Sequence, residues 1–257
     1  MRSGPTVLAL AVGLVVTPGL GGSPTEQALE PRALIKVVEE AKGEGLPGYT
    51  ATVDLVSVDG SVTRRQTMAL KVGRVEQRSN NSLVEFLEPP NARGQKVLMV
   101  QRNMWFLRPG LGKAVPISPR QRLVGEASVG DVASTNYVDD YAATLARDEP
   151  CGNEVCRVLE LKAASPKATY DRVLYWIVLA RLVAVKAEFF TVSGRRLKYA
   201  EFTYDNKVRF EGRTRSFLSE MVIHDDLDAA RSTTMKFSGV KVARFGASDF
   251  DLNLLAR

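Results

Sequence analysis

The sequence predicts a mainly β fold with a few helices, built around one large antiparallel sheet. About ten segments alternate apolar and polar residues or are rich in β-branched and aromatic residues. Short turns such as Asp59-Gly60 and Ser193-Gly194 join many of them, and such pairs are strong hairpin signals. Strands do not alternate with long helices, which argues against a parallel α/β sheet. With 257 residues, 45% of them hydrophobic, the chain is able to bury a sizeable core.

The N-terminus is typical of a secretory signal peptide over residues 1–21. Arg2 supplies a positive charge, Val7–Val16 is an apolar run, and small residues follow it, as in such signals. The small-x-small spacing of Gly19 and Gly21 places the cleavage near Gly21. The run has about half the length that a membrane-spanning helix needs. A buried N-terminal strand is the alternative interpretation.

Export is expected to leave residues 25–257 as a single domain. A lipoprotein signal needs a cysteine directly after the apolar run, and none is present there. We therefore expect a soluble protein in the periplasm rather than a membrane-anchored one.

The two cysteines are expected to form a disulfide. Cys151 and Cys156 flank a Gly-Asn turn, a spacing that suits a bridge across a hairpin in an oxidising compartment. Two free thiols are the alternative. Because the chain has one histidine, we predict no metal site, and nothing in the sequence indicates a cofactor.

The first half of the domain is predicted to contain one helix followed by strands. Apolar residues recur at helical spacing between Thr25 and Gly45. The strands that follow are expected at Tyr49–Leu55, Met68–Val72, Ser82–Leu87 and Lys96–Leu107, the last as one continuous strand.

The middle of the chain, Pro109–Asp148, breaks the strand pattern. Glycines and prolines indicate an irregular loop, after which Asp131 could cap a short helix. We expect the excursion to cover one face or the mouth of the sheet as a lid. Its apolar residues are Val132, Tyr137, Val138 and Tyr141.

Strands resume after this excursion. They are expected at Val155–Ala163, Thr169–Val178, Val183–Phe189, Leu197–Tyr204, Met221–His224 and Ser232–Phe237, with a tail to Arg257.

The sequence contains no recognisable catalytic constellation. His224 stands beside Asp225-Asp226 in what looks like a polar turn, and no Gly-x-Ser-x-Gly elbow supplies a nucleophile. Gly110–Lys113 resembles the end of a phosphate loop but lacks its upstream glycine and its Ser or Thr. The net charge of +6 is scattered, which argues against nucleic-acid binding. We predict no catalytic residue and no enzyme.

Some predicted strands are apolar on both faces, Lys96–Leu107 above all. A half-exposed antiparallel strand should alternate more cleanly. Either other layers cover both faces of the sheet, or one face lines a cavity that a ligand fills. Periodicity alone leaves both explanations open.

Three stretches, in order and in register, resemble the LolA-like family of outer-membrane lipoprotein-sorting proteins. The first runs from Phe86 through Glu-Pro-Pro-Asn-Ala-Arg-Gly94 to Met99. The second covers Asn103–Pro109, with Ile117-Ser118 and Arg122. The third is Leu182–Phe202. The resemblance extends over nearly the whole mature chain and is nearest to a poorly characterised branch of the family.

The resemblance implies a half-open antiparallel β-barrel wrapped around helices, with an apolar interior that receives acyl chains of lipoproteins or lipids. It implies transient membrane contact, for which the apolar turn Val178–Leu182 is one candidate, and an inner-membrane lipid or lipoprotein exporter as a partner. The side chains expected to line the cavity are Phe86, Leu98, Val100, Met104, Phe106, Phe189 and Phe202.

Two other functions remain open at this point. The chain could bind free lipids such as hopanoids, sterols or phospholipids for an exporter. It could also be an envelope interaction protein with a filled core and no ligand.

Overall fold

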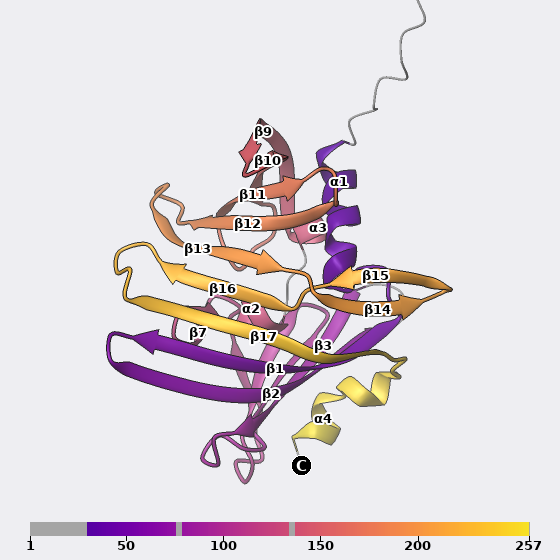
Figure 1. Ribbon diagram of the computed structural model, residues 1–257. Helices are drawn as coiled ribbons and strands as arrows, with labels where there is room; N and C mark the ends of the chain where they lie inside the picture. Colours follow the sequence, from indigo (N-terminus) through magenta and orange to yellow (C-terminus); the bar gives the residue numbers. More distant parts are fainter. Residues whose placement is uncertain (1–29, 76–78, 134–136, 257) are drawn as a thin grey trace, which may run out of the picture.

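The computed structural model describes residues 30–75, 79–133 and 137–256 (Figure 1). The predicted signal peptide, residues 1–21, lies outside these residues, as does the start of the predicted helix at Thr25.

Among the described residues, one 13-stranded antiparallel sheet dominates the fold, as predicted. Its order is β6-β5-β4-β3-β2-β1-β17-β16-β13-β12-β11-β10-β9. The strands are β1 (Gly48–Asp59), β2 (Val62–Val75), β3 (Ser79–Glu88), β4 (Lys96–Val100), β5 (Asn103–Leu107), β6 (Val115–Ile117), β9 (Tyr141–Cys151), β10 (Glu154–Ala163), β11 (Arg172–Val178), β12 (Val183–Phe190), β13 (Arg196–Thr203), β16 (Glu220–Asp225) and β17 (Arg231–Val242). Two short ribbons stand apart from it, β7 (Arg122–Val124) with β8 (Ala127–Ser128), and β14 (Asn206–Phe210) with β15 (Arg213–Phe217).

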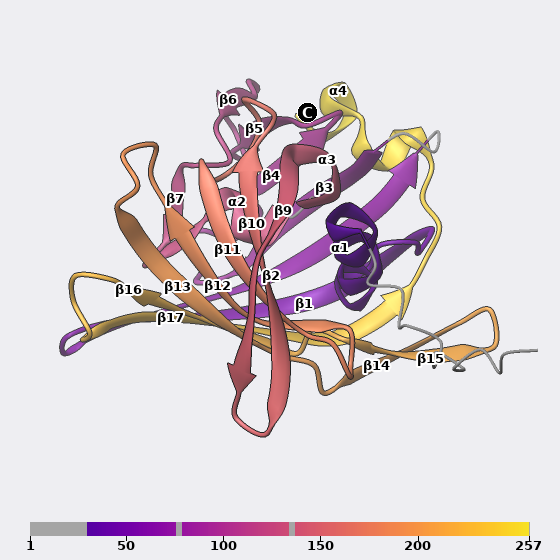
Figure 2. The same ribbon diagram turned by 90° about the horizontal axis from the view of Figure 1, so that it is seen from above.

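The sheet curls without closing into a barrel. Its two edge strands, β6 and β9, each have one ladder partner, and Figure 2 shows the sheet wrapped around α1 (Pro31–Glu39). The expected half-open barrel around helices is therefore present. Across the opening, Arg102 in the β4–β5 turn pairs with Asp140, and Lys167 Nζ donates to Asn103 Oδ1 at 2.5 Å.

Local sequence explains the first hairpin. Alternate residues of β1, including Val53 and Leu55, are buried, while their neighbours are more exposed, as a strand with one covered face requires. Asp59 pairs with Val62 across the turn, and Gly60 has a φ of 58°, which glycine adopts without a Cβ clash. The predicted Asp-Gly hairpin is confirmed.

The predicted continuous strand Lys96–Leu107 is wrong. It is a hairpin, β4 and β5, whose two-residue turn has positive φ values of 47° at Gln101 and 68° at Arg102. Gln and Arg are not typical turn residues, so the amino-acid composition at this position did not indicate a turn. The turn changes which residues share a face, because Met99 now lies opposite Met104 and Leu98 opposite Trp105.

The prediction of an irregular segment up to Asp148 is also wrong in its last part. Tyr141–Cys151 forms the edge strand β9. Most of its central residues are exposed, and Leu145 is 54% exposed. An edge strand that is solvated on both faces lacks the alternation by which strands are recognised. In the region of the expected helix, the described residues form α2 (Val129–Ala133) and α3 (Tyr137–Asp140).

The helix at the start of the domain is shorter than predicted and lies inside the curl. Leu34, Ile35 and Val38 of α1 are buried against the sheet. The 3-10 turn η1 (Glu40–Lys42) follows, and Gly43 ends it at a φ of 104°. Glycine is the usual residue at such a left-handed helix end.

The C-terminal tail covers part of the opposite face of the sheet. It forms η2 (Ala247–Phe250) and α4 (Leu252–Leu255). Phe250 packs with Leu83, Leu98 and Leu107 in a second apolar cluster, separate from the main core. At β3 to β5, therefore, the sheet is covered on both faces, and this explains its apolar residues on both sides.

We predict that Leu98→Ala lowers the free energy of unfolding by about 2–5 kcal/mol, because it empties a buried site that the tail closes. The control variant Leu254→Ala removes the same atoms from a residue of the tail, but the Leu254 side chain is 52% exposed. This control should change stability by less than about 0.5 kcal/mol. Urea unfolding followed by circular dichroism measures both, and equal losses would contradict the packing of the tail.

Candidate functional site

The concave face of the sheet gathers five of the seven predicted lining residues. Phe86, Met104, Phe106, Phe189 and Phe202 all belong to the main core inside the curl. The other two, Leu98 and Val100, belong to the cluster under the C-terminal tail, on the opposite face. The turn at Gln101-Arg102 separates them, because it reverses the parity that a continuous strand would have had.

The residues predicted as a lid lie within the curl. Val132 and Tyr137 are buried in the main core, Val138 packs against it, and Tyr141 begins β9 rather than ending a helix. Tyr137 stacks edge-on against both Tyr141 and Tyr175. The segment therefore fills the interior together with α1.

The space that remains inside is small. A cavity of about 30 Å³ lies between the helical segments and the sheet, whereas a ligand pocket typically holds roughly 300 Å³ or more. The helical segments α1, α2 and α3 therefore occupy most of the space inside the curl. The cavity is lined by Lys42, Tyr49, Leu70, Asp131, Val132, Tyr137, Phe202, Phe217, Leu218, Met221 and Phe237.

A buried polar cluster joins the first helical segment to the sheet. Lys42 Nζ donates to Glu39 Oε1 at 3.2 Å and to the Tyr175 hydroxyl at 2.6 Å, and that hydroxyl donates to Glu39 at 2.8 Å. The rings of Tyr137, Tyr175 and Phe202 lie 4.7–5.0 Å from the ammonium. Burial lowers the pKa of Lys42, against the opposing effect of Glu39.

A second buried cluster joins α2 to β13. Lys198 Nζ donates to Asp131 Oδ2 at 2.9 Å and to the backbone oxygen of Glu126 at 2.5 Å. The Tyr170 hydroxyl donates to Asp131 Oδ1 at 2.7 Å. Asp131 also accepts the backbone N–H of Ser128 at 2.8 Å, which stabilises the start of α2 as a capping residue does. Burial, followed by the charge of Asp131, raises the pKa of Tyr170 well above its usual value.

These two clusters, which we call the pins, connect covering segments to the concave face through charges. A buried ion pair contributes little net stability, since desolvation offsets most of its attraction. It does penalise other arrangements, because separating the partners inside the apolar interior leaves a charge unpaired. The pins therefore specify how the helical segments sit without adding the tight packing of a purely apolar core.

The sequence prediction did not include the pins. Asp131 was predicted only as a helix cap. Lys198 offered a signal, because it stands two and four residues before the inward-facing Ala200 and Phe202. Glu39 and Lys42 are spaced as a helical ion pair, but nothing in their spacing indicates burial.

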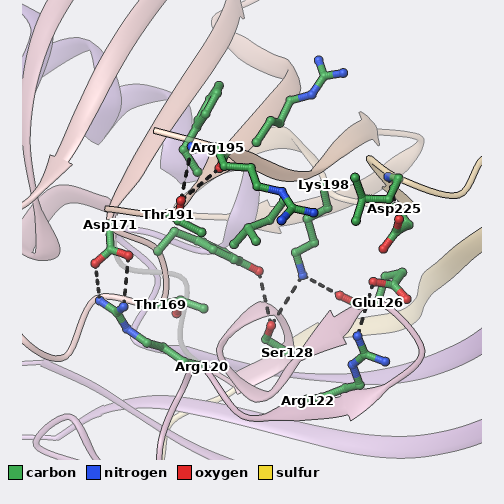
Figure 3. Close-up of a pocket in the computed structure, with 15 residues that line it drawn as sticks. Arg120, Arg122, Glu126, Ser128, Thr169, Asp171, Thr191, Arg195, Lys198 and Asp225 are labelled. Atoms are coloured by element: carbon green, nitrogen blue, oxygen red, sulfur yellow. Dashed lines mark hydrogen bonds and ion pairs between the residues drawn. The ribbon is translucent and has the colours of Figure 1, made fainter. Parts of the chain in front are cut away.

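A pocket of about 370 Å³ opens at one end of the curl (Figure 3). It lies where the β12–β13 turn, the loop between β10 and β11 and the β7–β8 ribbon meet. Phe190, Leu197 and Leu227 supply apolar walls, and the buried Lys198 reaches it from the second pin. The pocket thus combines apolar and charged surface directly outside a pin.

The charges around this pocket are mostly compensated. Arg120 donates to both carboxylate oxygens of Asp171, at 3.2 and 2.9 Å, as Figure 3 shows. Burial raises the pKa of Glu126, and the nearby Asp225 adds to this effect. Lys198 Nζ donates to the Glu126 backbone oxygen, the Ser128 hydroxyl and the Asp131 carboxylate, at 2.5, 3.5 and 2.9 Å.

The structure also shows where the remaining residues singled out in the sequence lie. The predicted disulfide between Cys151 and Cys156 is present and links β9 to β10. His224 lies on β16, where its ring stacks on Tyr199 at 4.6 Å. In the apolar turn, Val178 is buried and Leu182 is 37% exposed.

The described residues include no cluster of three or more potential metal ligands. None of the helices in the described part of the chain is long and apolar enough to cross a membrane.

Comparisons with known proteins identify relatives of this architecture. The model of a family described as an uncharacterized protein matches residues 78–257. No curated protein matches the sequence.

Solved structures are similar over most of the chain. A LolA superfamily protein from Nitrosomonas europaea is 26% identical, with a TM-score of 0.77, over 87% of this chain and 98% of that one. A domain described as an outer membrane lipoprotein-sorting protein, from Vibrio parahaemolyticus, is 21% identical, with a TM-score of 0.75, over 88% and 98%. A DUF1329 family protein from Desulfovibrio piger is 16% identical, with a TM-score of 0.73, over 88% and 99%.

We predict that Lys198→Met lowers the free energy of unfolding by about 3–5 kcal/mol, because it leaves Asp131 charged and buried. The double variant Lys198→Met with Asp131→Leu should recover most of the loss, since no unpaired charge remains. Urea unfolding of the two variants and the parent measures the difference. Additive losses in the double variant would show that the pair acts through packing alone.

Proposed function

This LolA-like chain belongs to the family of uncharacterized proteins whose model spans residues 78–257, and from that premise we propose that it is a periplasmic carrier that binds acyl chains of lipoproteins or lipids inside its curled sheet. In this proposal the helical segments that fill the curl occupy the place of the cargo when none is bound. The carrier is exported by its N-terminal signal, passes its cargo toward the outer membrane and performs no catalysis.

The observation that carries the proposal is the composition of the interior. One continuous apolar face, which includes Phe86, Met104, Phe189 and Phe202, is covered by short segments of the same chain. Two buried polar pins hold these segments in place. A structural core has no need for charged groups at this position, whereas a cover that must open and close again benefits from contacts that fix one position without strong net attraction.

The free energy of the cargo explains why such a cover is needed. Each methylene of an acyl chain gains about 0.8 kcal/mol when it leaves water, so a chain of about sixteen carbons loses roughly 10 kcal/mol or more if it is exposed. An empty apolar groove would expose its own walls to the same penalty. The helical segments remove that penalty in the empty state, and cargo replaces them in the loaded state.

The small interior volume favours a second candidate function. A cavity of about 30 Å³ also fits an envelope interaction protein whose core is permanently filled. The two functions differ in whether α2 and α3 leave the sheet.

The first experiment is mass spectrometry of lipids and acylated peptides that remain bound to the protein purified from its native envelope. The carrier function predicts stoichiometric acyl-containing cargo, and the masses separate acylated lipoproteins from free hopanoids, sterols or phospholipids. Absence of any acyl-containing or lipid ligand, with the protein folded, would favour the second candidate.

A further prediction concerns the cover. Replacing Gly130 and Thr169 by cysteines should allow a disulfide that fixes α2 to the loop between β10 and β11, because a Cβ at Gly130 would lie directly against the Thr169 side chain. The oxidised variant should take up a fluorescent fatty acid at least tenfold more weakly than its reduced form, because the cover cannot open.

The matched control joins two neighbouring strands instead. Val56 and Thr234 lie opposite each other on β1 and β17, and a disulfide there should leave uptake unchanged. The parent protein with and without reductant corrects for the native Cys151–Cys156 bridge. Equal uptake by the oxidised and reduced forms of the α2 variant would contradict an opening cover at α2.

A further inference from the structure

The β14–β15 ribbon projects from the body of the protein. Figures 1 and 2 both show it extending beyond the main sheet. It pairs with no strand of that sheet and turns through Glu211 and Gly212, whose φ values are 48° and 74°. A two-residue turn with positive φ at both positions matches the twist of a hairpin, so the two strands stay paired up to the turn.

The base of the ribbon is fixed to the body. The side-chain amide of Asn206 donates to the backbone oxygens of Leu218 and Phe237 at 2.8 and 2.7 Å. Phe217 is buried, with its ring 5.1 Å from that of Tyr49. The ribbon is thus a rigid extension rather than a loose loop.

The exposed part of the ribbon is basic and uncompensated. Lys207, Arg209 and Arg213 are exposed, and among the described residues none of the three forms an ion pair with a carboxylate. Lys207 Nζ donates to the Ser216 hydroxyl at 2.9 Å. Glu211 at the tip is the one acidic residue between positions 206 and 217. Most basic side chains of the main sheet are paired, whereas the ribbon gathers these three on one short projecting element.

The same ribbon contacts the cover of the interior. Arg215 pairs with Glu40 of η1 at 3.0 Å, and the Leu218 N–H donates to the Ala41 backbone oxygen at 2.8 Å. Phe217 and Leu218 both line the interior cavity. The ribbon is therefore connected directly to η1, which carries Lys42 of the first pin.

We propose that the β14–β15 ribbon is a docking surface for anionic phospholipid bilayers, and that it brings the η1 end of the interior against the membrane. Clustered lysines and arginines on a projecting element attract the negative surface of such a bilayer. The placement of these cations beside the cover favours a lipid surface, at which cargo is exchanged, over a soluble anionic partner. The inference rests on the proposed carrier function for its purpose, but docking itself requires no cargo.

The test is co-sedimentation of the full mature protein with vesicles of phosphatidylcholine, with and without phosphatidylglycerol, at about 0.1 M salt, where the Debye length is about 10 Å. The parent should bind the anionic vesicles and leave the neutral ones. The variant Lys207→Gln, Arg209→Gln, Arg213→Gln should lose roughly a hundredfold in partitioning, since each basic residue near the surface contributes about equally.

A matched control removes three charges elsewhere. Arg64, Arg65 and Lys113 are also exposed, and among the described residues they have no carboxylate partner. Changing these three to Gln should reduce partitioning less than threefold. Equal losses in the two triple variants would attribute binding to net charge and overturn the proposal. Unchanged binding by the ribbon variant would also overturn it. So would equal binding of the parent to neutral and anionic vesicles.

The two proposals are separated by a second measurement. Lipid content and fatty-acid uptake of the ribbon variant in solution should equal those of the parent, because its cavity is untouched. Loss of vesicle binding with uptake retained supports docking. If neither protein takes up lipid but the ribbon still selects anionic vesicles, the docking surface stands and the carrier function fails.

Discussion

A curled sheet with an apolar concave face must keep that face out of water, and this constraint organises the rest of the molecule. Closure into a barrel would require β6 and β9 to pair, and they do not. The chain instead places α1, α2 and α3 inside the curl, where they bury the aromatic side chains of β3, β5, β12 and β13. On the opposite face the C-terminal tail covers β3 to β5, and a further small apolar cluster of Cys156, Val158, Trp176 and Val178 lies on β10 and β11.

The interior is filled but not uniform. An ordinary core would hold its helices by apolar contact alone, whereas two of the covering segments are attached through Glu39, Lys42, Asp131 and Lys198. These contacts add little net stability, but they specify where the covering segments sit on the sheet. A cavity of about 30 Å³ lies beside them, and Lys42 and Asp131 are among the residues that line it. The proposed carrier function requires this balance, because a cover with too much affinity for the sheet would exclude the cargo.

In the described part of the chain, two charged surfaces lie beside the pins. The pocket near Lys198 has arginines that are largely paired, so its charge is balanced. The β14–β15 ribbon has unpaired cations and touches η1. The pocket lies beside the pin that holds α2. The ribbon contacts η1, the segment that carries Lys42 of the first pin. Each covering segment is thus accessible from outside through a different surface.

The sequence by itself determined the antiparallel β architecture, most strand positions, the Asp59-Gly60 hairpin and the Cys151–Cys156 bridge, because alternation and turn chemistry are local properties. Tertiary structure alone decided that Leu98 and Val100 face the tail while Met104 and Phe106 face the interior, since an unmarked turn at Gln101-Arg102 reverses their side. It also decided that β9 is a strand, because an exposed edge carries no periodic signal. The pairing of Asp131 with Lys198 was outside the reach of sequence reasoning, because these residues are 67 positions apart and only the curl of the sheet makes them neighbours.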